Sequence, residues 1–163
     1  MKRTFQEVAA NYFRYSILKC NANYDIAEMY KVRHRRFGVW VVGITILVGT
    51  SVFAALAGME SPTAQALTAF LSVAAVILAA LQTFLGFSDL QSQHKTAAAG
   101  YGDVRRDIEL LVMKFPEATG AENELGTDEI ASIKKHLDDL DMTSPTIPDK
   151  VWDAIVKKSS LTE

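Results

Sequence analysis

One long stretch of the chain is almost free of charge. Residues 37–88 contain a single charged side chain, Glu60, whereas the remaining 111 residues contain 35. Glu60 divides the stretch into the uncharged runs 37–59 and 61–88, and each run exceeds the roughly 20 apolar residues that a membrane-spanning helix needs. A buried helical pair in a soluble protein is the alternative, but the rest of the chain is too charged to cover two helices that are apolar on all sides. The pattern therefore favours a membrane protein.

The middle of this stretch carries the signals of a turn. Pro62 lacks a backbone N–H and suits the first turn of a helix, and Ser61 can cap that helix. A charge is costly at the centre of a bilayer, so Glu60 is expected at the far aqueous boundary. These signals predict a transmembrane helical hairpin with spans at about 37–59 and 64–88 and a loop near 60–63.

The residues before the first span form an amphipathic pattern. Between residues 4 and 36, apolar side chains recur near helical spacing at Phe5, Val8, Tyr12, Ile17, Cys20, Tyr24 and Ala27. The same arm holds six aromatic residues, Phe5, Tyr12, Phe13, Tyr15, Tyr24 and Tyr30. We expect residues 1–36 to form an N-terminal cytoplasmic helix whose aromatic stripe packs into a core. The alternative is a basic helix that lies on the bilayer surface.

The clearest periodicity follows the second span. Eight residues alternate steps of four and three, and they are termed the seam: Leu90, His94, Ala97, Tyr101, Val104, Ile108, Leu111 and Phe115. A period of 3.5 residues is typical of a helix that packs along one line, as in a coiled coil. The seam presents more apolar surface than one short helix can cover. We therefore expect a homo-oligomer in which the N-terminal arm also packs against the seam.

The seam helix has predicted ends and one internal irregularity. The second span is expected to continue without a break to Phe115, where Pro116 ends the helix. Gly100 and Gly102 flank Tyr101 and weaken the helix by about 1 kcal/mol each relative to alanine. They are explained either by the close approach of a neighbouring helix or by a hinge.

The C-terminal part predicts two more helices. Residues 117–126 form a linker, after which Thr127 caps a helix whose apolar face contains Ile130, Ile133, Leu137 and Leu140. Pro145 and Pro148 break the chain before a short last helix with Val151, Trp152 and Ile155. The fold class is therefore all-α: an N-terminal helix at 1–36, a transmembrane hairpin at 37–88 and a cytoplasmic helical region at 89–163, in an oligomeric bundle.

Charge is segregated along the chain. Residues 1–36 have a net charge of +5 and residues 117–163 a net charge of −6, so the two ends can dock on each other and no nucleic-acid partner is expected. The cations Lys31, Arg33, Arg35 and Arg36 abut the first span, Lys95, Arg105 and Arg106 follow the second, and the loop has neither Lys nor Arg. The positive-inside rule then predicts a multi-pass protein of the inner (plasma) membrane with both termini in the cytoplasm.

Small and polar residues share one side of the second span. They step by four and three residues and are termed the small-residue face: Thr68, Ser72, Ala75, Ala79, Gln82 and Gly86. Small residues let helices approach closely, within the hairpin or between protomers. The alternative is that this face lines a water-filled passage, which would need several copies because two helices cannot enclose a pore.

The sequence contains no recognisable catalytic or metal-binding pattern. The three histidines lack metal-ligand spacing, and Asp138, Asp139 and Asp141 point in different directions from a helix, as on a solvated face. The single cysteine, Cys20, fits a reducing compartment and a small apolar position on a helix. His94 is either a hydrogen-bonded packing residue or a pH sensor. We expect no enzyme, no cofactor and no metal.

Two segments and the overall layout resemble a known family. The segments are HKTAAAGYGDVRRDIE at 94–109, with Ala98, Tyr101 and Arg105, and LDMTSPTIPDKVWDAI at 140–155. With the basic arm, the two spans and the long cytoplasmic helix, they resemble the SLATT family, two-transmembrane proteins associated with SMODS nucleotidyltransferases and SLOG-type nucleotide-binding domains in prokaryotic conflict systems. The resemblance implies a membrane effector of an antiviral defence system, with a nucleotide second messenger or a nucleotide-sensing protein as its partner.

The resulting expectation is an oligomer that forms a pore or disrupts the inner membrane when a signal arrives. Its contacts are membrane lipid and further copies of itself, and its cytoplasmic helices hold the spans closed. The main alternative is a non-conducting anchor that recruits a cytoplasmic partner through the acidic C-terminal helices. A phage holin would fit two spans but explains the long cytoplasmic region poorly.

Overall fold

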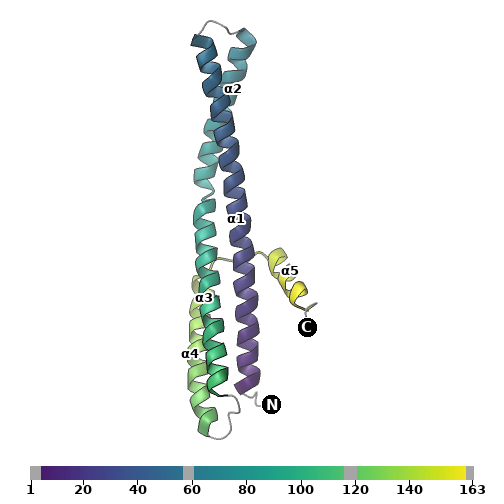
Figure 1. Cartoon of the computed structure of the whole chain (residues 1–163), viewed down its shortest axis with the longest axis vertical. Coiled ribbons are helices and arrows are strands. Elements are labelled where there is room, and N and C mark those ends of the chain that lie inside the picture. The colour runs from purple at the N-terminus through teal and green to yellow at the C-terminus, as the bar shows by residue number, and fades with distance from the viewer. Residues whose placement is uncertain (1–4, 57–60, 116–120, 161–163) are drawn as a thin grey trace. The chain divides into compact units, whose positions relative to one another are not determined.

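The computed structural model describes residues 5–56, 61–115 and 121–160, with side chains at 5–51, 61–115 and 126–160. Throughout these residues the chain is helical apart from short turns, and no strand occurs in them. Five helices follow one another: α1 (Phe5–Leu56), α2 (Pro62–Phe84), α3 (Phe87–Lys114), α4 (Ala121–Thr143) and α5 (Asp149–Ser160) (Figure 1). The all-α prediction is confirmed for this part of the chain. Glu60, the predicted tip of the hairpin, lies outside it.

The chain divides into two compact units. The first unit comprises Met1–Glu28 and Leu90–Glu163, and the second unit comprises Met29–Asp89. Helices α1 and α3 therefore each contribute to both units. The predicted boundary after residue 36 does not coincide with a break, because α1 runs through it as one helix. No proline or other helix-ending signal occurs there. What changes at this point is the type of side chain, from charged to apolar.

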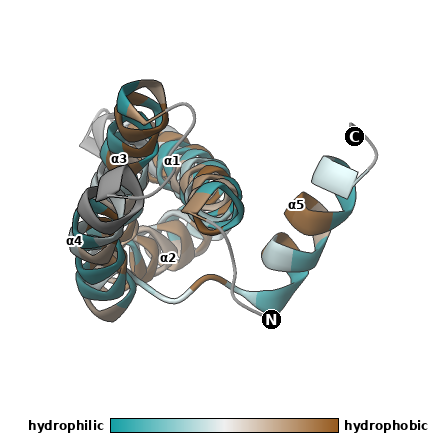
Figure 2. Ribbon diagram, turned by 90° about the horizontal axis from the view of Figure 1, so that it is seen from below, coloured by the Kyte–Doolittle hydropathy of each residue, from teal (hydrophilic) through white to brown (hydrophobic). Residues whose placement is uncertain are grey.

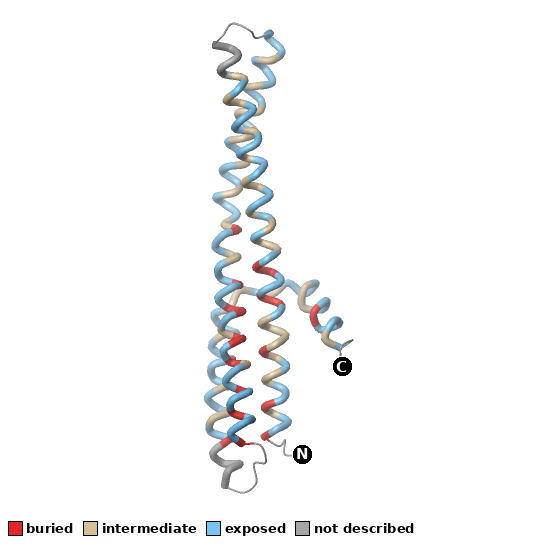
Figure 3. Tube along the Cα trace, viewed as in Figure 1, coloured by how far each residue is buried: buried red, intermediate tan, exposed pale blue. Residues whose placement is uncertain are grey.

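The core of the first unit is built on the seam. Seven of the eight seam residues are buried, all except Leu90, which is half-buried (Figure 3). Tyr101, Val104 and Ile108 form a cluster with Ala9 of α1 and Leu137 of α4. Leu111 and Phe115 form a second cluster with Phe5, whose ring meets that of Phe115 edge-on at 6.1 Å between centroids. The predicted packing of the N-terminal arm on the seam is confirmed.

This packing changes the argument for an oligomer. Helices α1 and α4 of the same chain cover the seam, so its apolar surface does not require a second copy of the protein. The prediction compared the seam with a single short helix, whereas two helices of the same chain pack on it. Self-association stays a prediction, and the contacts between copies would have to be made by residues outside the seam.

Two glycines lie where helices approach each other closely. A Cβ atom placed on Gly100 would stand 2.7 Å from Leu140 Cδ2, and one on Gly126 would stand 3.1 Å from ring atoms of Phe5. Gly102 has only ordinary neighbours, at 3.8 Å. Helix α3 continues through Gly100 and Gly102 without interruption. Close packing therefore explains Gly100, and no hinge is formed there.

Two predicted helix boundaries were wrong. Helix α4 begins at Ala121, so Thr127 lies inside it and does not cap it, and part of the predicted linker is helical. Helices α2 and α3 are separated by a turn at Leu85 and Gly86, where Gly86 has φ +52°. This left-handed conformation suits glycine, which has no Cβ to clash with the next carbonyl group. The second span consequently does not run as one unbroken helix to Phe115.

Other predictions of helix ends were correct. Ser61 has extended backbone angles and its hydroxyl accepts a hydrogen bond from the Ala64 N–H at 3.4 Å, with Pro62 in the first turn of α2. The short last helix exists as α5, and Ile155 on its inner face is buried. Lys157 and Lys158 in its last turn suit the negative end of the helix dipole.

Candidate functional site

Helix α2 exposes an unusually apolar surface. It contains no buried residue, and Phe70 and Phe84 are 70% and 87% exposed. Hydrophobic residues, brown in Figure 2, make up much of its ribbon. The neighbouring part of α1 also exposes Val39 and Trp40, at 66% and 69%. Soluble proteins rarely expose apolar surface this extensive without a partner.

One helical run in the described residues is long and apolar enough to cross a membrane. It extends from Pro62 to Lys114, and its apolar part is α2. The first predicted span, 37–59, extends past Ser51, after which no side chains are described. The described residues are therefore helical, and they include one long apolar helix that fits a bilayer.

The hydroxyl groups within the apolar helices are satisfied internally. Six Ser and Thr side chains each donate to the carbonyl group four residues earlier, at distances of 2.5–3.1 Å: Thr45, Thr50 and Ser51 in α1, and Thr68, Ser72 and Thr83 in α2. Such bonds need neither water nor a partner helix. They allow polar residues to lie in an environment that has no hydrogen-bonding groups of its own.

The small-residue face lies on the less exposed side of α2. Thr68, Ser72, Ala75 and Gln82 are half-buried, as is Gly86 in the following turn, whereas Ala79 is exposed. Gln82 lies next to α1, since a Cβ on Gly38 would stand 3.8 Å from its Nε2 atom. Within a single chain the face is therefore partly covered by α1, which agrees with packing inside the hairpin.

The start of α3 is surrounded by aromatic rings. Phe87 is buried, and its ring lies 6.1 Å from that of Tyr30 and 5.6 Å from that of Phe37, between centroids. Beside it is a cavity of about 430 Å³ that is lined by His34, Gln82, Gly86, Ser88 and Asp89 among others. The cavity follows from the turn at Gly86, which interrupts the helix where the apolar surface of α2 ends.

The four cations that were used to predict the membrane orientation lie on α1 in the same region as Tyr30, His34 and Phe37. Lys31, Arg33, Arg35 and Arg36 are all exposed. The Arg33 guanidinium stands 6.0 Å from the centroid of the Tyr30 ring. The first exposed apolar side chains, Val39 and Trp40, follow within about one helical turn.

The first unit contains a polar cluster centred on Asp141. Tyr101 Oη donates to Asp141 Oδ1 at 2.6 Å and Tyr15 Oη donates to Oδ2 at 2.7 Å, while Lys19 Nζ stands 3.0 Å from Oδ1. The cluster joins α1, α3 and α4. Asp141 was predicted to lie on a solvated face; its position is exposed, as expected, but its carboxylate also has three partners that were not predicted. Its three donors lie 40 or more positions away in sequence, so no local pattern could reveal them.

The electrostatics of the cluster follow from these bonds. Burial acts to raise the pKa of Asp141, but hydrogen bonds from Tyr101, Tyr15 and Lys19 outweigh it and hold the pKa below its usual value. Burial and the bond to this carboxylate raise the pKa of Tyr101 to about 12, and the same causes raise the pKa of Tyr15. At neutral pH the cluster consists of a carboxylate, two neutral phenols and one ammonium group.

Aromatic rings surround the ammonium group of Lys19. Its Nζ lies 5.3 Å from the ring centroid of Tyr15, 5.9 Å from that of Tyr101 and 5.6 Å from that of Trp152 in α5. The Lys19 ammonium group thus lies among three aromatic rings and beside the negatively charged Asp141 carboxylate. Because one of these rings belongs to Trp152, the contacts of Lys19 connect the C-terminal helix α5 to the N-terminal helix α1.

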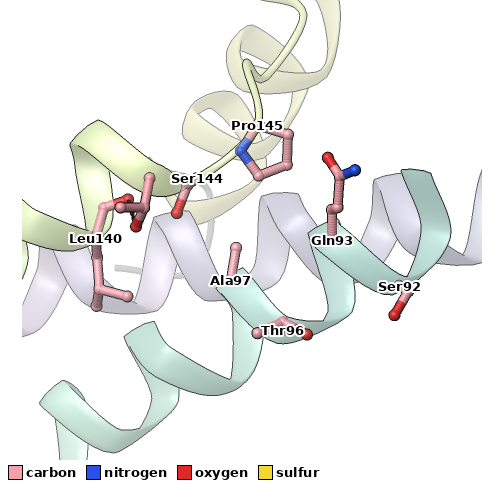
Figure 4. A pocket seen from close by; sticks show the side chains of 8 residues that line it. Ser92, Gln93, Thr96, Ala97, Leu140, Ser144 and Pro145 are labelled. Carbon is pink, nitrogen blue, oxygen red and sulfur yellow. Dashed lines mark hydrogen bonds between the residues drawn. The ribbon is translucent and has the colours of Figure 1, made fainter. Parts of the chain in front are cut away.

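A second cavity lies near the end of α4 and is lined by none of the cluster residues. It has a volume of about 300 Å³ and lies between α3 and the end of α4 (Figure 4). Gln93, Thr96 and Ala97 contribute from α3, and Leu140 and Ser144 from the other side. The cavity is open to solvent, and no charged side chain lines it.

His94 is a buried packing residue. Its Nδ1 stands 2.8 Å from Asn23 Oδ1, and Asn23 Nδ2 donates to the Lys19 carbonyl group, so Nδ1 is the donor in this pair. Burial lowers the pKa of His94. Cys20, also on α1, packs against the core as a small apolar residue, and burial raises the pKa of its thiol.

Comparison with protein families, curated proteins and solved structures finds no match for this chain. The resemblance to the SLATT family therefore depends on the two segments and the layout alone. Within the described residues, no group of three or more His, Cys, Asp or Glu side chains could hold a metal ion.

Proposed function

We propose that the chain is a membrane effector whose second unit crosses the inner membrane as a two-helix hairpin. The observation that carries this proposal is α2, an apolar helix of 23 residues with no buried side chain. Its length of about 35 Å matches the hydrocarbon core of a bilayer. The apolar end of α1 would form the other span, and the cations before it favour cytoplasmic termini.

In this proposal the first unit is the cytoplasmic part that controls the spans. Its core is complete within one chain, so the bundle of α1, α3 and α4 is a folded body that can transmit a signal along α1 and α3. Both helices continue into the second unit. A change in the Asp141 cluster could thus reach the spans without passing through a loop.

Activation is proposed to assemble several hairpins into a pore. The small-residue face would then line the passage or pack between copies, with Gln82 as its most polar member. Gln82 has no hydrogen-bond partner within the described chain, unlike the six hydroxyl groups of the apolar helices. A free amide in the last turn of α2 could contact water in an open state.

The resemblance to the SLATT family supplies the proposed biological setting. The effector would belong to a prokaryotic antiviral system in which a nucleotide second messenger, or a protein that senses one, triggers the membrane event. The alternative is a non-conducting anchor that recruits a partner through its acidic C-terminal helices, to which the exposed Asp138 and Asp139 of α4 would contribute.

Dye entry in cells that overproduce the full chain distinguishes these functions. We expect loss of membrane potential and uptake of a membrane-impermeant dye, at a level of protein at which a control hairpin protein causes neither. Membrane-inserted protein that leaves the potential unchanged, with and without candidate nucleotides in a vesicle assay, would favour the anchor.

A further inference from the structure

Three arginines at the end of the charged part of α1 have no acidic partner among the described residues. Arg33, Arg35 and Arg36 are exposed, and no carboxylate in the described residues lies within ion-pair distance of them. Two arginines of the first unit differ: Arg105 pairs with Glu109, and Arg106 pairs with Asp103.

Two of these arginines share one side of α1 with two amphipathic aromatic residues. Tyr30, Arg33, Arg36 and Trp40 follow at steps of three, three and four, so their side chains lie on one face within about 15 Å along the axis. The Arg33 guanidinium already contacts the Tyr30 ring, at 6.0 Å from its centroid. Trp40 is 69% exposed. These four residues are termed the ladder.

The ladder lies at the level of α1 where charged side chains are followed by exposed apolar ones. Phe37, within the ladder's length, contacts Phe87 at the end of the turn that follows α2. Beyond this level the described side chains of both helices are uncharged and most of the exposed ones are apolar, with Trp40 on α1 and Phe84 on α2 as examples. Tyrosine and tryptophan favour the headgroup region of a bilayer, and arginine forms paired hydrogen bonds with phosphate.

We propose that the ladder binds the headgroup of an anionic phospholipid. Arg33 and Arg36 would hold the phosphodiester, and Trp40 would lie beside the start of the acyl chains. The apolar residues next to the arginines select a lipid over a free phosphate ion, which needs no such surface. This inference rests on the proposed insertion of the second unit into the membrane.

The charge of the site selects the class of lipid. Asp89 is the only carboxylate among the described residues of the second unit, against three unpaired arginines. A zwitterionic headgroup carries a cation of its own, which the arginines would repel. An anionic headgroup carries no such cation. Each cation near a surface favours anionic lipid by roughly fivefold, so the pair in the ladder is expected to contribute about 25-fold.

The test uses the full chain, purified in a neutral detergent and mixed with equal amounts of phosphatidylglycerol and phosphatidylcholine. Lipid that remains on the protein is then counted by native mass spectrometry. We expect preferential retention of phosphatidylglycerol, a loss of about tenfold or more in that preference for Arg33→Gln/Arg36→Gln, and no change for the matched control Arg105→Gln/Arg106→Gln. Equal retention of both lipids by the wild-type chain, or equal losses in both double variants, would overturn the proposal.

A second measurement reports on the position of the lipid. In a Trp152→Phe background, Trp40 is the remaining tryptophan, and brominated phosphatidylglycerol should quench it more strongly than brominated phosphatidylcholine does. Equal quenching would contradict binding at the ladder. Failure of the proposed membrane insertion is distinguishable, because the chain would then remain in the soluble fraction of cells before any lipid is added.

Discussion

Tyr101 of α3 donates a 2.6 Å hydrogen bond to Asp141 near the end of α4. This bond joins the two sequence segments that resemble the SLATT family, 94–109 and 140–155. Trp152 of the second segment also lies 5.6 Å from Lys19, which is paired with Asp141. The two segments are therefore joined by one set of contacts, the Asp141 cluster together with Trp152. This set is termed the clasp, and it connects α1, α3, α4 and α5.

The clasp should contribute measurably to stability. Tyr101→Phe removes one hydrogen bond to a carboxylate and should lower the free energy of unfolding by about 1.5 kcal/mol, the low end of the usual range because 34% of the Asp141 side chain is exposed. Asp141→Asn should cost at least as much, because it weakens three contacts. Unfolding by denaturant, followed by Trp152 fluorescence in a Trp40→Phe background, measures both. The double variant should cost less than the sum of the single ones, and strict additivity would argue against the clasp.

The dependence of stability on pH should have two separate origins. The lowered pKa of Asp141 contributes stability that is present above its unfolded value of about 4 and is lost as the pH falls through the folded value. The lowered pKa of His94 likewise contributes stability that is present above about 6.5 and is lost on acidification. His94→Asn keeps a donor for Asn23 and should flatten the decline that begins below pH 6.5. Asp141→Asn should leave that decline intact, and the reverse result would contradict these assignments.

The two glycines beside Tyr101 should respond differently to alanine. Gly102→Ala adds a methyl group in ordinary contact and should stabilise the first unit by up to about 1 kcal/mol through helix propensity. Gly100→Ala places its methyl group 2.7 Å from Leu140 Cδ2, so the gain should be cancelled or reversed by repacking. The difference between the two variants, measured by thermal unfolding, is the test. Equal stabilisation would show that α3 and α4 do not approach closely at Gly100.

The small-residue face offers a test of the pore. Gln82→Leu should abolish dye entry while the amount of inserted protein stays unchanged, because the only unpaired amide on the face is removed. Val76→Leu is the matched control, since Val76 is 69% exposed on the outer side of α2. If the face only packs, Gln82→Leu should instead lower the stability of the oligomer.

The sequence predicted the elements that depend on local or periodic signals. The 3.5-residue spacing of the seam identified its buried side, and Ser61 with Pro62 marked the start of α2. The turn at Gly86 was missed because its spacing from Gln82 also fits a continuous helical face. The early start of α4 was missed because Gly126 suggested a linker, whereas the structure uses it to accommodate Phe5.

The features that sequence could not reveal are long-range. Asp141 looked like one of three solvated carboxylates, and only the folded chain brings Tyr15, 126 positions away, to it. The coverage of the seam by α4 was missed for a similar reason. The sequence of an amphipathic helix shows its apolar face but does not show which other helix packs on that face. Both features arise from packing between segments that are distant in the chain.

The proposed function requires that the second unit crosses the membrane as a hairpin with both termini in the cytoplasm. Cysteines introduced at Ser61 and at Ser159, each in a Cys20→Ala background, can be treated in intact cells with a membrane-impermeant maleimide. We expect labelling at position 61 from outside the cell, and labelling at position 159 only after the membrane is opened. Protection of position 61 in intact cells, or labelling of both positions from outside, would contradict it.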